Sequence, residues 1–339
     1  MRPLTHFAVI VCSVLLLTAS LTAQATKPTT APETKPDLTR VVATVNGQKI
    51  LEKSVQRALT RVPAQHHKTA RKEIVNVLVE QALMDQYLQQ IKIPVAKKEV
   101  DERLQQMKDA IKKRKLDFEK MLKEMMLTQE ELLDHVAADL RWEKFVKKYV
   151  TDGAAKAHFE KNKEMFDGSM VRASHVLITP KDKKPESLVK AKEHATALKA
   201  NLQKQVDTAL AKLPKDADKL TRAKKRVEVL DKEFAALAKK ESACPSKQQG
   251  GDLGWFPRNG MMVEAFAKEA FRIQPYQLSD VVETQFGAHF ILVTERKKGR
   301  DVKYKDASDI AKRVYQEKLR RDLMKQLKEK SKIVISPSQ

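Results

Sequence analysis

The segment from residue 242 to residue 256 constrains the fold more than any other part of the chain. It reads Ser-Ala-Cys-Pro-Ser-Lys-Gln-Gln-Gly-Gly-Asp-Leu-Gly-Trp-Phe. The adjacent Gly250 and Gly251 allow positive φ angles or a close backbone approach that other residues resist. The Trp-Phe pair at its end supplies large apolar side chains that require a core. Because Gly-Gly-Asp is common in turns, the segment becomes informative only together with segments elsewhere in the chain.

Two further segments each combine one histidine with an apolar run. The upstream segment is Ala-Ser-His-Val-Leu-Ile at residues 173–178, and the downstream one is Gln-Phe-Gly-Ala-His-Phe-Ile-Leu at residues 285–292. In order, in spacing around the glycines and in both histidines, residues 170–297 resemble the parvulin class of peptidyl-prolyl cis–trans isomerases. The flanking segments are similar to the SurA- and PrsA-type exported foldase-chaperones, in which an N-terminal helical domain and the extreme C-terminus surround such a domain.

The resemblance implies an α+β protein in which an FKBP-like α/β parvulin domain is inserted into a helical chaperone domain built from both chain ends. The expected limits are a signal peptide at 1–25, a Pro/Thr-rich linker at 26–39, the helical domain at 40–167, the parvulin domain at 168–300 and a C-terminal helix and strand at 301–339, which pack on the N-terminal domain.

The first 25 residues have the pattern of a signal peptide. Arg2 provides the positive charge, residues 7–17 an apolar stretch too short for a stable membrane span, and Ala-Gln-Ala at 23–25 a cleavage site. Cys12 lies inside this segment without the small residue before it that lipid attachment needs, so the mature chain would keep one cysteine and no internal disulfide. The sequence therefore predicts a protein that is exported to the periplasm or cell envelope and is soluble after cleavage.

The formal net charge of +22 raises the possibility of nucleic-acid binding. The lysines, however, are spread over predicted helices with interleaved glutamates, and aromatic residues are scarce. Because no stacking surface or DNA-binding motif accompanies the charge, we expect solvated helix faces and no nucleic acid. The sequence also predicts no cofactor and no metal, and it leaves the oligomeric state open.

Residues 40–167 begin with a β-hairpin signal and continue with helical patterns. Residues 41–45 and 48–51 flank Asn46-Gly47, the strongest two-residue hairpin turn. Apolar residues then recur every three or four positions in several stretches, at 74–83, 100–111, 118–126 and 132–149. Near the C-terminus, 306–330 predict a basic amphipathic helix and 333–335 a short strand. A three-residue strand cannot stand alone, and the SurA-like arrangement implies that it pairs with the hairpin.

The chain departs from the parvulin pattern between the first histidine strand and Cys244, where more than sixty residues replace a shorter helical connection. Within this insertion, at about 181–240, two apolar seams predict an antiparallel helical hairpin. The seam residues are Leu188, Ala191, Ala195, Leu198 and Leu202 in the first helix, and Leu220, Ala223, Val227, Leu230, Phe234 and Leu237 in the second. The helices either project as an arm, which the length of the seams favours, or pack entirely on the isomerase sheet.

The resemblance assigns roles to eight side chains. His175, Cys244, His289 and Thr284 match the polar groups of the catalytic site, and Leu253, Met261, Met262 and Phe266 match the lining of the proline slot. One extra residue between Leu253 and Phe266 leaves open which methionine points inward. Relatives carry either Cys or Asp at the position of Cys244, so the resemblance implies hydrogen bonding and an electrostatic effect rather than covalent chemistry.

Other interpretations of these residues fit the sequence less well. A single histidine on an apolar strand is usually a core group, and a lone cysteine is usually an inert small side chain. A cysteine protease would need an oxyanion hole and a substrate cleft besides a Cys–His pair, for which the parvulin motifs leave no room. The predicted function is isomerisation of X–Pro bonds in unfolded or nascent exported polypeptides, with chaperone activity. The alternative is a holdase that binds peptides with little turnover.

Overall fold

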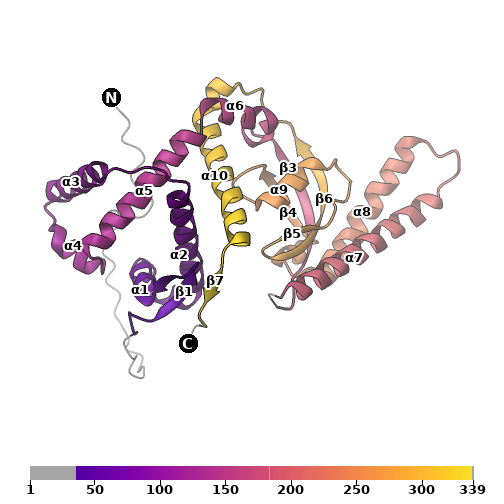
Figure 1. Ribbon diagram of the computed structural model, residues 1–339. Coiled ribbons are helices and arrows are strands. Elements are labelled where there is room, and N and C mark those ends of the chain that lie inside the picture. Colours follow the sequence, from indigo (N-terminus) through magenta and orange to yellow (C-terminus); the bar gives the residue numbers. More distant parts are fainter. Residues whose placement is uncertain (1–35, 183, 338–339) are drawn as a thin grey trace, which may run out of the picture. The chain divides into compact units, whose positions relative to one another are not determined.

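The computed structural model describes residues 36–182 and 184–337, and these form two compact units (Figure 1). Among the described residues, one unit holds 36–154 and 313–337, and the other holds 155–182 and 184–312. The first and last described segments therefore belong to one unit while the middle forms the other, which confirms the predicted class of an α+β domain inserted into a helical one. The signal peptide at 1–25 and most of the linker at 26–39 lie outside the described residues. The domain limits at 167/168 and 300/301 stay a prediction.

The first unit is mainly helical. Its elements are β1 (Val41–Val45), β2 (Gln48–Leu51), α1 (Glu52–Leu59), η1 (Ala64–His66), α2 (His67–Gln90), α3 (Lys97–Lys113), α4 (Phe118–Glu124), α5 (Gln129–Tyr149), the later part of α10 (Tyr304–Lys330) and β7 (Ile333–Ile335). α2 buries Val75, Val79 and Leu83 against β1, β2 and α1, and Met324 of α10 joins this core. Within residues 36–182 and 184–337, no helix is both long and apolar enough to cross a bilayer.

The small sheet of this unit joins the two ends of the chain. Asn46 and Gly47 both have positive φ angles, 52° and 90°, as the predicted two-residue turn between β1 and β2 requires. The strand order is β2-β1-β7, and β7 is antiparallel to β1 with Thr44 opposite Val334. The pairing extends beyond the strands, because Asn46 N donates to Lys332 O at 2.9 Å. The C-terminal strand is therefore an edge strand of the hairpin sheet, as predicted.

A buried carboxylate fixes the start of α1. The Glu52 side chain is 2% exposed and accepts hydrogen bonds from Arg71, Gln56 and Arg40, the last at 3.1 Å. The bonds from Arg71 are the main reason why the pKa of Glu52 falls to about 2. This ion pair ties α1 to α2 and to the segment before β1, and the sequence analysis did not anticipate it.

The second unit is built around a four-stranded antiparallel sheet of order β4-β3-β6-β5. Its elements are most of α6 (Asp152–Lys161), η2 (Lys163–Met165), β3 (Met170–Ile178), α7 (Pro185–Ala211), α8 (Lys219–Glu241), η3 (Pro245–Gln249), β4 (Asp252–Pro257), α9 (Glu264–Arg272), β5 (Val282–Thr284), β6 (Gly287–Lys297) and the start of α10. α9 covers one face of the sheet with Phe266 and Phe271. α7 and α8 cover the other face, where Phe234 meets Phe290.

The insertion forms the predicted helical hairpin, which we call the arm (residues 185–241). Figure 1 shows α7 and α8 side by side, packing on the sheet at one end and extending past it at the other. The two interpretations of the insertion therefore hold for different parts of it. The prediction of the second seam is wrong for its first two residues, because Leu220 is 63% exposed and Ala223 is also exposed. A helical period gives the orientation of a face, but it does not tell how far along the helix a partner continues.

Candidate active site

The two central strands place both histidines on one face of the sheet. β3 and β6 are antiparallel, with His175 opposite Ile291 and Leu177 opposite His289. The histidines are thus diagonal neighbours, a separation that ring side chains can bridge. Ile291 lies in the core under α9, so both rings point to the α9 side, away from the arm.

Thr284, His289 and His175 form a continuous chain of polar contacts. Nδ1 of His175 lies 3.2 Å from Nδ1 of His289, and Nε2 of His289 lies 2.8 Å from Oγ1 of Thr284. Oγ1 of Thr284 also accepts the backbone N–H of Phe286 at 3.1 Å, which leaves its own proton free for His289. In that assignment His289 carries its proton on Nδ1 and donates it to His175, so that His175 carries its proton on Nε2. Nε2 of His175 is buried and has no hydrogen-bond partner in the part of the chain that the structure describes.

Burial keeps the two imidazoles neutral. His175 is 5% exposed and His289 is 4% exposed. Loss of hydration disfavours the charged form, and burial is the main reason why the pKa of each ring falls to about 4; for His175 the neighbouring His289 is a second cause. At neutral pH the site therefore offers uncharged donors and acceptors in a dry environment.

Phe266 of α9 closes the site above the histidines. Its ring meets His175 and His289 edge-on, with centroids 5.4 and 5.6 Å apart. Leu253 and Met262 pack in the same apolar cluster. Met261 is 61% exposed and lies outside that cluster, so Met262 is the methionine on the apolar side. The structure thus gathers six of the eight predicted side chains, which are His175, His289, Thr284, Phe266, Leu253 and Met262.

Cys244 lies at the start of η3 and is joined to the site through the backbone. Ser242, just after α8, has a buried hydroxyl that accepts the backbone N–H of both Cys244 and Leu177, at 3.3 and 3.1 Å. The free thiol of Cys244 is half-buried, and within the described residues it makes no hydrogen bond to either histidine. Ser242 was not among the predicted site residues, because a small polar residue directly after a helical seam carries no distinctive pattern.

Gly251 brings the cysteine segment against β3. Its carbonyl accepts the backbone N–H of His175 at 3.0 Å, and its φ angle is +87°. A β-carbon at this position would lie 2.5 Å from the carbonyl oxygen of His175 and 3.1 Å from Cβ of Ala238 in α8. The close approach predicted from the glycine pair therefore exists, and it sets the position of His175.

A second unanticipated contact holds the methionine loop. Arg258 is 4% exposed and forms a two-pronged ion pair with Glu264, the first residue of α9, at 2.8 and 2.9 Å. Because Met261 and Met262 lie between these residues, the pair fixes the loop next to Phe266. The only signal in the sequence is an arginine six residues before a glutamate.

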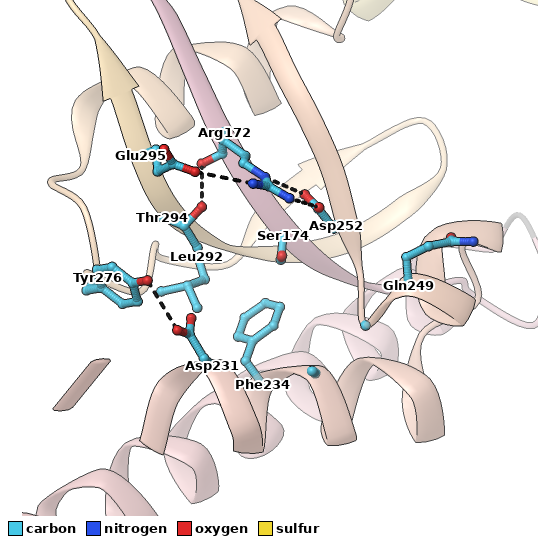
Figure 2. Close-up of a pocket in the computed structure, with 12 residues that line it drawn as sticks. Arg172, Ser174, Asp231, Phe234, Gln249, Asp252, Tyr276, Leu292, Thr294 and Glu295 are labelled. Atoms are coloured by element: carbon cyan, nitrogen blue, oxygen red, sulfur yellow. Dashed lines mark hydrogen bonds and ion pairs between the residues drawn. The ribbon is translucent and has the colours of Figure 1, made fainter. Parts of the chain in front are cut away.

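The arm side of the sheet carries a polar recess of about 310 Å³, shown in Figure 2. Arg172 bridges Asp252 at 2.7 Å and Glu295 at 3.3 Å, and these bonds raise its pKa. Tyr276 donates to Asp231 of α8 at 3.2 Å. Arg172 is paired with Asp252 and Glu295 and so links β3 to β4 and β6. The charged residues of the recess therefore stabilise the sheet. The recess lies on the face opposite to the histidines.

Known proteins match both units. Residues 156–297 match the PPIC-type PPIase domain, and residues 4–146 match the SurA-like N-terminal domain. The foldase protein PrsA of Bacillus subtilis is 30% identical over 253 residues, which cover 72% of this chain and 66% of that protein. The peptidyl-prolyl cis-trans isomerase ESS1 of Saccharomyces cerevisiae is 37% identical over 121 residues, which cover 36% of this chain and 63% of that protein. The chain therefore spans just under two thirds of the length of these two relatives.

Among solved structures, PrsA from Bacillus anthracis is 23% identical, covers 76% of this chain and 96% of its own, and has a TM-score of 0.41. The family matches and the geometry agree that the second unit is a PPIC-type peptidyl-prolyl isomerase domain of the parvulin class. Together with the match of residues 4–146 to the SurA-like N-terminal domain, the chain combines these two kinds of domain and is similar to the foldase protein PrsA.

Proposed function

We propose that this chain accelerates the cis–trans isomerisation of X–Pro bonds in unfolded exported polypeptides and also acts on them as a chaperone. The observation that carries the proposal is the pair of buried, neutral histidines beneath the edge of Phe266. The matches to a PPIC-type domain and to proteins named as foldases support it.

The reaction needs no bond to carbon. Amide resonance sets a barrier of roughly 18–20 kcal/mol, and catalysis requires only that the twisted amide be bound better than either planar form. In the proposed site the pyrrolidine ring lies against Phe266, Met262 and Leu253, which exclude water. Water exclusion favours the twisted amide, because the planar amide has the larger dipole and loses more hydration.

The polar groups would then stabilise the twisted state. We assign to His175, His289 and Thr284 a fixed chain of hydrogen bonds that ends in Nε2–H of His175, a donor with no partner among the described residues. The proposed role of Cys244 is to hydrogen-bond the substrate amide or to act on it through its field, without forming a covalent bond. Met261, exposed at the rim, would contact residues that flank the proline.

Export to the periplasm or cell envelope is part of the proposal. It rests on the signal-peptide pattern of residues 1–25 and on similarity to proteins named foldase and chaperone. The proposed partners are unfolded polypeptides that contain proline, and not nucleic acids.

The test uses the chain without residues 1–25 in two assays. Isomerisation of a short X–Pro peptide is followed by a protease that cleaves only the trans form, and aggregation of an unfolded protein without cis-prolines is followed by light scattering. We expect acceleration in the first assay and suppression in the second. A chain that suppresses aggregation but does not accelerate isomerisation would contradict the enzymatic proposal and favour the holdase alternative.

A further inference from the structure

The outer end of the arm carries a concentration of positive charge. We define the arm tip as residues 211–225, the turn between α7 and α8 with the adjoining helical residues. It contains six basic and two acidic side chains, a net charge of +4 in fifteen residues. Four of the lysines are exposed and form no ion pair within the described residues; they are Lys212, Lys215, Lys219 and Lys224.

Among the described residues, the arm tip makes no polar side-chain contact outside the arm. The outermost such contacts of the arm are Lys199 of α7 with Asp280 at 3.1 Å and Arg226 of α8 with the carbonyl of Tyr276 at 3.2 Å. Beyond them, Arg222 bonds only to carbonyls of the turn, at 3.2 and 3.4 Å, and Asp218 caps α8. The arginine therefore holds the turn together while the four lysines face solvent.

An exposed apolar side chain lies among these lysines. Leu220 follows Lys219 directly, is one helical turn from Lys224 and is 63% exposed, the largest exposed fraction among the large apolar residues of the described chain. Leu220 does not contribute to the packing between α7 and α8. The buried contacts of that seam, such as Val206 and Leu230, lie closer to the sheet.

We infer that the arm tip binds the surface of an anionic phospholipid bilayer. Compact ammonium groups attract anionic headgroups, and an apolar side chain beside them inserts at the headgroup boundary. An acidic polypeptide would be attracted by the same charge, but it offers carboxylates rather than an apolar layer for Leu220. The combination of four unpaired lysines with a single protruding leucine favours the bilayer. This inference does not depend on the proposed isomerase activity.

The test measures co-sedimentation of the chain without residues 1–25 with vesicles of phosphatidylglycerol and phosphatidylcholine. The tip variant replaces Lys212, Lys215, Lys219 and Lys224 by Gln, and a second variant is Leu220→Ser. The matched control replaces four exposed lysines of the other unit, Lys112, Lys113, Lys120 and Lys123, by Gln, which lowers the net charge equally. No variant touches the site, so isomerisation measured in parallel reports on the folding of the unit that carries the tip. Thermal unfolding reports on the first unit, which carries the control lysines.

We expect binding to anionic vesicles at low ionic strength that weakens by roughly fivefold for each tip lysine removed. Leu220→Ser should weaken binding without changing its dependence on salt, and the control variant should bind like the unaltered chain. Equal loss in the tip and control variants would overturn the inference in favour of a general effect of net charge. Binding of the unaltered chain to poly-glutamate but not to vesicles would overturn it in favour of an acidic polypeptide.

Discussion

Replacing Gly251 by alanine should damage both the stability and the activity of the isomerase unit. The φ angle of +87° costs an alanine roughly 1–2 kcal/mol. The new β-carbon would also lie 2.5 Å from the carbonyl oxygen of His175, and relief of such a backbone clash adds about 1–3 kcal/mol. The expected loss of stability is therefore about 2–5 kcal/mol.

Gly254 offers a matched control in the neighbouring strand. It also has a positive φ angle, +67°, but a β-carbon there would meet no atom within 4 Å. Gly254→Ala should therefore cost only the roughly 1–2 kcal/mol of backbone strain. The difference between the two variants isolates the contact with His175.

Urea unfolding followed by tryptophan fluorescence measures this difference in stability, provided that the only tryptophan of the chain lies in the second unit. Trp142 lies in α5 of the first unit and Trp255 in β4 of the second, so Trp142→Phe leaves Trp255 as the only tryptophan. Because Gly251 binds the backbone of His175, we also expect Gly251→Ala to lower kcat/KM by more than about tenfold. Equal losses of stability in the two alanine variants, or normal activity in Gly251→Ala, would refute the reasoning.

Three further predictions concern the cysteine, the histidines and the C-terminal strand. Cys244→Asp should retain more isomerase activity than Cys244→Ala; complete loss in a folded Asp variant would point to thiol chemistry. The stability that neutral His175 and His289 provide should be fully present above about pH 6.5 and lost as the pH falls towards 4, because the rings of the unfolded chain take up protons first. Urea unfolding at pH values from 7 to 4 measures this loss. A free energy of unfolding that did not fall over this range would contradict the neutral pair. Deleting residues 331–339 should lower the melting temperature of the first unit and leave isomerisation unchanged, since β7 pairs with β1 alone among the described strands. An unchanged melting curve would contradict a structural role for β7. Half of Val334 and Ile335 is exposed, so the cost should be a few kcal/mol at most.

The sequence predicted those parts of the fold that depend on local patterns. Asn46-Gly47 determines a hairpin by its own backbone preferences, and the strand periods of the two histidine segments already require that their rings share a face if the strands pair. That the two histidine strands pair was predicted from the resemblance, which rests on the spacing of the motifs. For the same reason Phe266 could be assigned from the motif, while the choice of Met262 over Met261 needed the course of the loop.

The ion pairs of buried charged residues could not be predicted. Glu52 is a buried carboxylate that is satisfied by Arg71, and Arg258 is a buried guanidinium that is satisfied by Glu264. Charged residues are usually exposed, so nothing in their local pattern marks them as buried. The exposed Leu220 is the converse case, an apolar residue with the right period but beyond the end of its partner.

The central claim is that prolyl isomerisation takes place in the slot under Phe266, and Phe271 provides the direct comparison. Both rings belong to α9 and to the same core cluster, at 3% and 4% exposed, but only Phe266 meets the histidines. Each change to alanine should cost similar stability, about 3–5 kcal/mol, and Trp255 fluorescence shows whether the variant is folded. The decisive measurement is kcat/KM for an X–Pro peptide at a temperature where both variants are folded. We predict a loss of roughly thirtyfold or more in Phe266→Ala, from about 2 kcal/mol of apolar contact with the proline ring, and near-normal activity in Phe271→Ala. Equal activity in the two folded variants would contradict the assignment of the site.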